Sequence, residues 1–125
     1  HENFGLMYDT CHGQMLGGVG ARQQGEKEVV KDQLELISKF SGRINHIHLI
    51  DSDNTCHKDA DGNDETSAHP PFGDGILDFD QIVPVLAKEN IGHDWWTVDL
   101  CFWPEAWDAT EKCKSALDGL VSKYG

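Results

Sequence analysis

The chain has 125 residues, of which 38% are hydrophobic, and its formal net charge at pH 7 is −12. This length and this apolar content allow one domain with a modest core, and they exclude the compositions of disordered and fibrous proteins. The negative charge opposes binding to nucleic-acid phosphates and to anionic lipid surfaces, so we expect neither nucleic acid nor a membrane as a partner.

The first predicted strand covers residues 4–9 and ends at Asp9, in the run Asp-Thr-Cys-His that closes with His12. Residues 10–25 are rich in Gly and Gln and are predicted to form a long loop. Residues 26–40 then predict an amphipathic helix, because their apolar side chains recur on one face.

The second predicted strand covers residues 44–50 and carries His46 and His48 on one face. Residues 52–75, which are rich in Asp, Asn and Gly, are predicted to form a second long loop. Both long loops follow the carboxyl end of a strand, whereas the links from helix to strand are short. This asymmetry is typical of an active-site rim.

The last part of the chain predicts a helix over residues 79–90 with Asp78 as its N-cap, and a third strand over residues 95–102 that contains Asp99. Pro104 is predicted to open a final amphipathic helix. Strands that alternate with amphipathic helices indicate an α/β fold with a parallel sheet covered by helices.

Three of the chemically interesting side chains come at or near the ends of the predicted strands: Asp9, His48 and Asp99. The carboxyl ends of parallel strands meet at one rim, so we expect these side chains to converge. In the period-two pattern each would face away from the helices. Mixed carboxylate and imidazole ligands predict a site for a divalent metal ion.

Each of these residues also has a purely structural interpretation. Asp9 could cap a turn or helix, His48 could be a hydrogen-bonded core residue with His46 competing for its role, and Asp99 could be a turn acid. A carboxylate buried among the tryptophans near Asp99 would, however, need a charged partner, and a metal ion provides one.

Several stretches of the chain resemble the xylose-isomerase-like TIM barrels, a family of sugar and sugar-phosphate isomerases and epimerases that also includes apurinic-site endonucleases. The stretches are Gly-Leu-Met-Tyr-Asp-Thr-Cys-His (5–12), His-Ile-His-Leu-Ile-Asp (46–51), His-Pro-Pro-Phe-Gly-Asp-Gly-Ile-Leu-Asp-Phe (69–79) and the acid Asp99. The resemblance implies a (β/α)8 barrel of which residues 1–125 form the C-terminal part, about the last three βα units. The earlier units, with one more metal-binding Glu, would come from upstream sequence, a second copy or another chain.

The resemblance also implies roles for individual residues. Asp9, His48 and Asp99 correspond to ligands of a divalent ion, which could be Mn²⁺, Mg²⁺, Co²⁺ or Zn²⁺. His12 corresponds to a residue that binds the substrate or a second ion, and His69 to a residue that contacts a substrate oxygen. Asp99 stands where Glu is more common, so its carboxylate is about one methylene shorter. It is also our candidate catalytic carboxylate for proton transfer.

We therefore expect a metal-dependent sugar or sugar-phosphate isomerase or epimerase that abstracts a proton next to a carbonyl of a small-molecule sugar. One alternative is an apurinic-site endonuclease-like hydrolase, against which stand the acidic charge and Ser67, where that branch has an Asp. The other alternative is a non-catalytic barrel fragment or subunit.

The cysteines and the apolar runs give an expected location. Cys11, Cys56, Cys101 and Cys113 include no Cys-x-x-Cys pair, so we expect reduced thiols. No apolar run approaches the length of a membrane span, and the first residues lack the pattern of a signal peptide. We expect a cytoplasmic protein.

Overall fold

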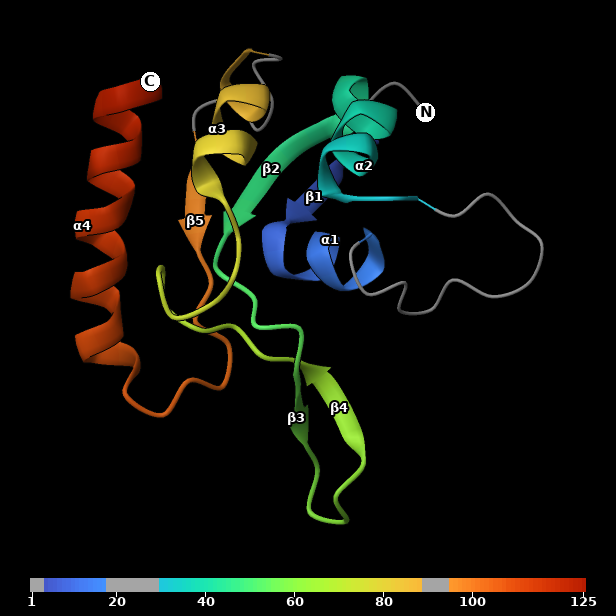
Figure 1. Ribbon diagram of the computed structural model, residues 1–125, viewed down its shortest axis with the longest axis vertical. Helices are drawn as coiled ribbons and strands as arrows, with labels where there is room; N and C mark the ends of the chain where they lie inside the picture. Colours follow the sequence, from blue (N-terminus) through green and yellow to red (C-terminus); the bar gives the residue numbers. More distant parts are fainter. Residues whose placement is uncertain (1–3, 18–29, 89–94) are drawn as a thin grey trace.

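A parallel sheet forms the centre of the structure, a computed structural model that describes residues 4–17, 30–88 and 95–125. The sheet has three strands in the spatial order β1 (Leu6–Asp9), β2 (Ile44–Leu49) and β5 (Trp96–Val98) (Figure 1). Parallel neighbours need a crossover, and in each case the crossover contains a helix. The predicted α/β fold with a parallel sheet is therefore confirmed.

The helices follow the strands in the βα order that the sequence predicts. They are α1 (Thr10–Gly17), α2 (Gln33–Phe40), α3 (Phe79–Lys88) and α4 (Ala106–Tyr124), with a short 3₁₀ turn, η1 (Ser41–Arg43), between α2 and β2. None of the helices in the described ranges is long and apolar enough to cross a membrane.

The core lies between the sheet and the helices α2 and α3. Tyr8, Ile47 and Leu49 point from the sheet into this layer and are buried. The helices contribute the buried side chains Leu36, Ile37, Ile82, Val83 and Leu86. Each fully buried side chain of this size stabilises the fold by about 1.5–3 kcal/mol relative to an exposed one.

The opposite face of the sheet carries the polar side chains of the predicted rim. Met7, His46 and Thr97 lie on this face; Met7 and Thr97 are exposed and His46 is half-buried. In the part of the chain that the structure describes, this stretch of the face therefore remains open to solvent. The candidate ligands lie on the same face, at the carboxyl ends of the strands.

Two predicted loops contain regular structure instead. Residues 10–17 form α1, which begins directly after β1 because Asp9 accepts a hydrogen bond from the backbone N–H of His12 at 2.9 Å and so caps the helix. The rest of this predicted loop, residues 18–25, lies outside the described residues. The weak apolar pattern of α1 explains why periodicity did not reveal it.

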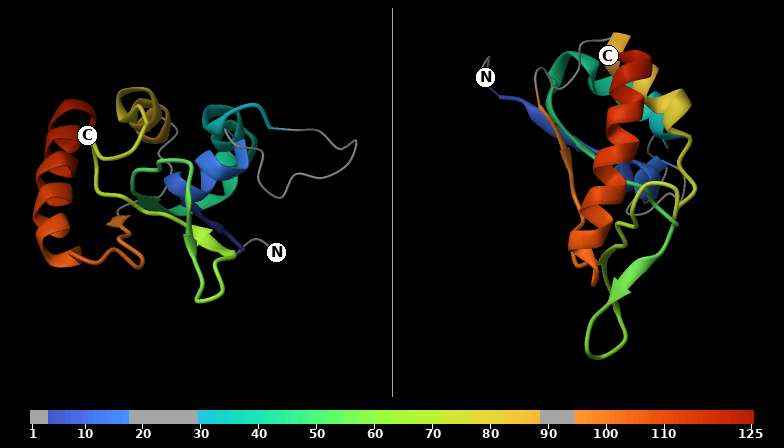
Figure 2. Two further views of the ribbon diagram at one scale, coloured as in Figure 1. Left: turned by 60° about the horizontal axis from the view of Figure 1, so that its bottom comes forward. Right: turned by 90° about the vertical axis from the view of Figure 1, so that its left-hand side faces the viewer.

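The second predicted loop contains an antiparallel hairpin of β3 (Cys56–Lys58) and β4 (Asp64–Ser67), which projects away from the sheet (Figure 2). Its tip turns through Gly62, whose φ is +86° and so favours glycine. The hairpin is short and its sequence is polar, so the alternation that marks a half-buried strand is missing.

Two predicted elements are shorter in the structure. α2 begins at Gln33, because the Asp32 carboxylate accepts from the N–H of Glu35 at 2.9 Å; residues 26–29 of the predicted helix lie outside the described part. The third strand stops at Val98 rather than Phe102. The N–H of Trp103 donates to the carbonyl of Leu100, which closes a turn in place of the strand.

Candidate metal centre

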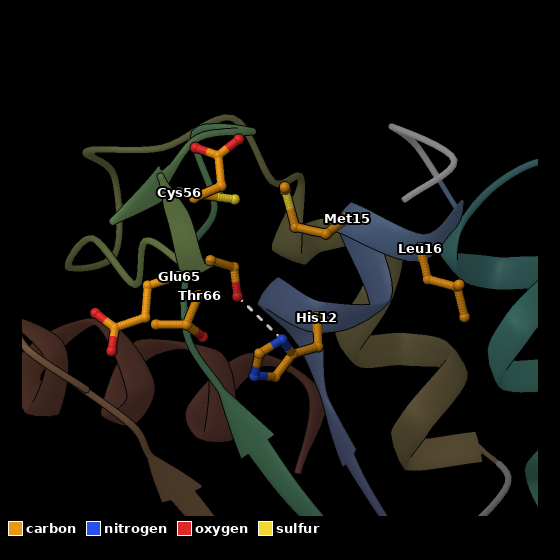
Figure 3. A pocket seen from close by; sticks show the side chains of 8 residues that line it. His12, Met15, Leu16, Cys56, Glu65 and Thr66 are labelled. Carbon is orange, nitrogen blue, oxygen red and sulfur yellow. Dashed lines mark hydrogen bonds between the residues drawn. The ribbon is translucent and has the colours of Figure 1, made fainter. Parts of the chain in front are cut away.

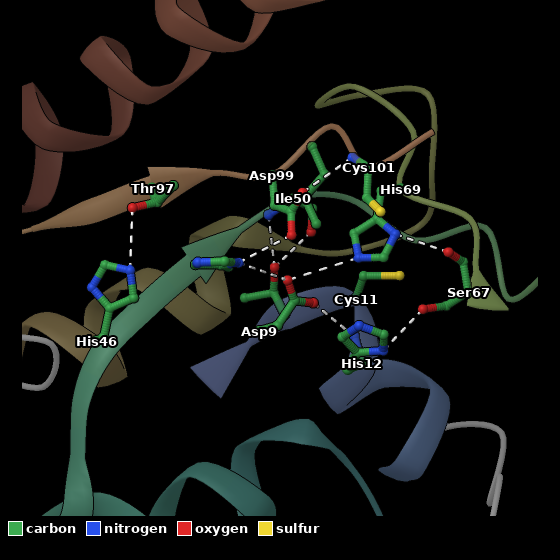
Figure 4. Close-up of polar contacts among 12 residues, drawn as sticks. Asp9, Cys11, His12, His46, Ile50, Ser67, His69, Thr97, Asp99 and Cys101 are labelled. Atoms are coloured by element: carbon green, nitrogen blue, oxygen red, sulfur yellow. Dashed lines mark hydrogen bonds and ion pairs between the residues drawn. The ribbon is translucent and has the colours of Figure 1, made fainter. Parts of the chain in front are cut away.

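The strand register brings Asp9, His48 and Asp99 together. Asp9 of β1 pairs with His48 of β2, and His48 pairs with Thr97 of β5, so Asp99 follows two residues later on the same face. One potential ligand atom from each of the three residues lies within 4.8 Å of the others. Figure 4 labels Asp9 and Asp99 of this group. The convergence expected from the sequence therefore occurs.

Asp9 presents one bare carboxylate oxygen to this cluster. Its Oδ1 accepts the N–H of His12, whereas its buried Oδ2 has no hydrogen-bond partner among the residues that the structure describes. Oδ2 faces the Nδ1 of His48 at 3.7 Å and the Nε2 of His69 at 3.8 Å. A buried carboxylate oxygen without a partner is costly, so this position fits a cation.

His69 is oriented toward the same point. Its Nδ1 lies 2.8 Å from the carbonyl oxygen of Ser67, which can only accept, so Nδ1 carries the hydrogen. In the neutral ring Nε2 then carries a lone pair, and within the described part of the chain this buried atom also has no hydrogen-bond partner. The Nε2 of His69 is thus held in a fixed orientation toward the Asp9 carboxylate, at the edge of the candidate centre.

Cys11 completes a second possible ligand group with Asp9 and His69, again with atoms within 4.8 Å of one another. Its thiol donates to the carbonyl of Ala68 at 3.0 Å. Burial raises the pKa of Cys11 to about 11, so the group is a neutral thiol at pH 7. The Asp9 carboxylate thus belongs to both possible ligand groups, the one with His48 and Asp99 and the one with Cys11 and His69.

Asp99 and His48 form the open side of the cluster. The Oδ1 of Asp99 accepts the N–H of Cys101 at 3.1 Å, and its Oδ2 lies 3.1 Å from the Nδ1 of His48. The side chains of His48 and Asp99 are 21% and 31% exposed, whereas that of Asp9 is 3% exposed. A small molecule can therefore approach from the side of His48 and Asp99.

The two remaining histidines of the prediction lie beside these groups. His12 is exposed on α1, its Nδ1 lies 3.0 Å from the hydroxyl of Ser67, and its ring meets the edge of the His69 ring. His46 lies edge-on to His48, and its Nε2 lies 3.3 Å from the hydroxyl of Thr97. The structure thus places His48, and not His46, in the candidate ligand group.

A sequence model of the xylose isomerase-like TIM barrel family matches residues 1–118. The chain belongs to this family. Searches of curated proteins and of solved structures gave no match. The parallel strands β1, β2 and β5, with helices on one face and polar side chains at their carboxyl ends, are the arrangement that a TIM barrel produces.

Asp51 is a structural residue of this TIM barrel chain whose role the sequence did not reveal. It is 1% exposed, and its two oxygens accept four backbone N–H groups, those of Ser52, Gly73, Gly75 and Leu77, at 2.8–3.1 Å. The carboxylate therefore ties the loop before α3 to the end of β2. The one sequence feature that could have indicated this role is its position three residues after the candidate ligand His48.

Thr10 fixes the start of α1 against β2 in the same region. Its hydroxyl donates to the carbonyl of Ile50 at 2.6 Å and accepts the N–H of Ile50 at 2.9 Å. This buried pair joins the ends of the two strands that carry Asp9 and His48. In this family member the ligand positions are thus set by hydrogen bonds between neighbouring strand ends.

Proposed function

We propose that this chain provides the divalent-metal centre of a sugar or sugar-phosphate isomerase or epimerase that removes a proton next to a carbonyl. The observation that carries the proposal is the buried Oδ2 of Asp9, which accepts no hydrogen bond from the residues described and faces His48 and His69. Family membership supports it, because the chain has the strand ends on which such barrels place their chemistry.

The ligands we propose are Asp9, His48 and Asp99. Two carboxylates and one imidazole suit Mn²⁺, Mg²⁺, Co²⁺ or Zn²⁺. A bound divalent ion would supply stabilisation of negative charge on a substrate oxygen. In Asp9 and Asp99 one carboxylate oxygen accepts a backbone N–H and the other faces the centre, so the backbone orients both groups.

The reaction also needs a group that accepts a carbon-bound proton. Asp99 is our candidate, because its Oδ2 is free of backbone hydrogen bonds and its side chain is open to solvent. His12 and His69 are proposed to contact substrate oxygens: His12 is exposed beside the centre, and the Nε2 of His69 is aimed into it.

We propose further that other strands complete the barrel around this sheet. They would come from upstream sequence, a second copy or another chain. Met7 is 56% exposed on the face that a closed barrel buries, and this supports the proposal. Sedimentation of the protein tests it: a folded monomer of this chain alone that retains the metal would contradict it.

The experiment for the metal centre combines metal analysis with proton exchange. The protein is loaded with Mn²⁺, and incorporation of deuterium from D₂O next to the carbonyl of ketoses and ketose phosphates is followed by NMR. We expect Asp9→Ala and His48→Ala to lose both the metal and the exchange. His46→Ala is the matched control, because His46 shares the face of His48 but is outside the ligand group.

Two outcomes would contradict the proposal. Metal content that is unchanged in Asp9→Ala and His48→Ala would remove the site. Metal-dependent cleavage of DNA at abasic positions, without deuterium incorporation into any sugar, would assign the same centre to the endonuclease branch instead.

A further inference from the structure

A cleft of about 550 Å³ lies between α1 and the hairpin of β3 and β4 (Figure 3). Its volume is in the range of small-molecule sites. α1 contributes Met15 and Leu16 to the lining, and the hairpin contributes Cys56. The cleft is therefore a built space between two elements that the sequence did not predict.

The cleft adjoins the candidate metal centre through two residues that contact His69. His12 and Ser67 line it, and the hydroxyl of Ser67 lies 3.0 Å from the Nδ1 of His12. The carbonyl of Ser67 also anchors His69, whose Nε2 faces Asp9. A substrate whose carbonyl end lies at the metal centre can thus extend its other end past His12 into the cleft.

The charge of the cleft is negative. The hairpin wall carries Asp64 and Glu65, together with the hydroxyl of Thr66. No lysine or arginine is among the described residues that line the cleft, and the nearby Lys58 ammonium is paired with the Asp64 carboxylate. A phosphate dianion would meet like charge on the described lining and would find no fork of basic donors among those residues.

We propose that this cleft holds the non-reacting end of an uncharged, polyhydroxylated substrate and discriminates against phosphate esters. The inference rests on the proposed isomerase or epimerase function and narrows its substrate class to free sugars. The Glu65 carboxylate and the Thr66 hydroxyl accept hydrogen bonds from sugar hydroxyls. Met15 and Leu16 contact the C–H face of the carbon chain.

Calorimetry on the protein tests this in two steps. Mn²⁺ is titrated first, and D-fructose or D-fructose 6-phosphate is then titrated into the Mn²⁺-loaded protein. We expect D-fructose to bind about tenfold more tightly than its phosphate ester, as like-charge repulsion requires. Inorganic phosphate, titrated separately, shows whether a phosphate group alone is attracted to the centre, and we expect no binding.

Charge variants of the cleft sharpen the test. Glu65→Lys should improve binding of D-fructose 6-phosphate by about fivefold, the size of one exposed charge interaction, and Glu65→Gln should improve it less. Glu111→Lys, on the exposed surface of α4, changes the net charge equally and should leave both affinities unchanged. Unchanged Mn²⁺ affinity shows that each variant is folded.

The possible failures are distinguishable. Absence of Mn²⁺ binding by the protein with its barrel completed would overturn the proposed function itself. Three results obtained with normal Mn²⁺ binding would overturn the substrate inference and leave the metal centre intact. They are equal or tighter binding of the phosphate ester, no binding of the sugar, and equal effects of Glu65→Lys and Glu111→Lys.

Discussion

Asp9 and Asp51 are both almost completely buried, with 5% and 1% exposure, yet their surroundings are opposite. Asp51 has two N–H donors on each oxygen, so its charge is stabilised by the backbone. Asp9 has one N–H donor on Oδ1, and no described residue donates to its Oδ2. Both carboxylates are thus buried. The difference between the candidate ligand Asp9 and the structural residue Asp51 is whether each oxygen accepts a hydrogen bond from the described residues.

The two regions also differ in what they hold in place. The Asp51 region is a closed network, in which the carbonyl of Ser52 additionally accepts the N–H of Ile76 at 2.8 Å. The Asp9 region is open, because the Oδ2 of Asp9 and the Nε2 of His69 face each other at 3.8 Å, and neither has a hydrogen-bond partner among the described residues. We therefore expect mutations in the first region to reduce stability, and those in the second to reduce metal binding.

The largest expected effect is that of Asp51→Asn. The amide keeps one acceptor oxygen and turns an NH₂ group toward two backbone N–H donors, so we expect a loss of about 3 kcal/mol in the free energy of unfolding. Urea denaturation followed by circular dichroism measures it. A loss below about 1 kcal/mol would show that the network is not fully formed in solution.

Asp9→Asn should have the opposite effect on stability. The amide oxygen can still accept the N–H of His12, and the unpaired charge is removed, so without metal we expect a gain of about 1 kcal/mol in the free energy of unfolding. The affinity for Mn²⁺ should fall about 100-fold, or about 2.7 kcal/mol. Calorimetry and urea denaturation in EDTA measure the two effects, and a destabilised apo variant would contradict the comparison.

Gly75→Ala tests the closed network from its other side. A Cβ at this position would lie 2.3 Å from the Oδ1 of Asp51 and 2.5 Å from the carbonyl oxygen of Ser52. We expect a loss of about 2 kcal/mol, because the buried loop cannot relax freely. Gly119→Ala on α4 is the control, since a Cβ there meets nothing within 4 Å and should stabilise the helix by up to about 1 kcal/mol.

Ser67→Ala should produce the smallest effect. It removes the hydroxyl beside His12 but keeps the carbonyl that anchors His69. We expect sugar affinity to fall about fivefold, the value of one hydrogen bond, with Mn²⁺ affinity unchanged. Sugar and Mn²⁺ titrations measure both, and a parallel fall in Mn²⁺ affinity would place His12 among the metal ligands.

Much of the fold could be predicted from local patterns. Alternating residues marked the strands that carry Asp9 and His48, and the 3.6-residue spacing marked α3 and α4. The sequence predicted neither α1 nor the hairpin. Asp9 was considered as a possible cap, but the helix that it caps has a weak apolar pattern, and the hairpin is short and polar. The third strand was predicted to extend to residue 102 but ends at Val98. The turn that follows it does not interrupt the run of apolar residues, so the sequence pattern did not indicate it.

The sequence by itself determined the family, the βα order and the placing of Asp9, His48 and Asp99 near the carboxyl ends of parallel strands. These follow from periodicity and motif order, which are properties of neighbouring residues. Only the tertiary structure decided which carboxylate oxygens are satisfied. The partners of Asp51 lie up to 26 residues away, and His69 meets Asp9 across 60 positions of the chain, so hydrogen-bond pairing had to be seen in three dimensions.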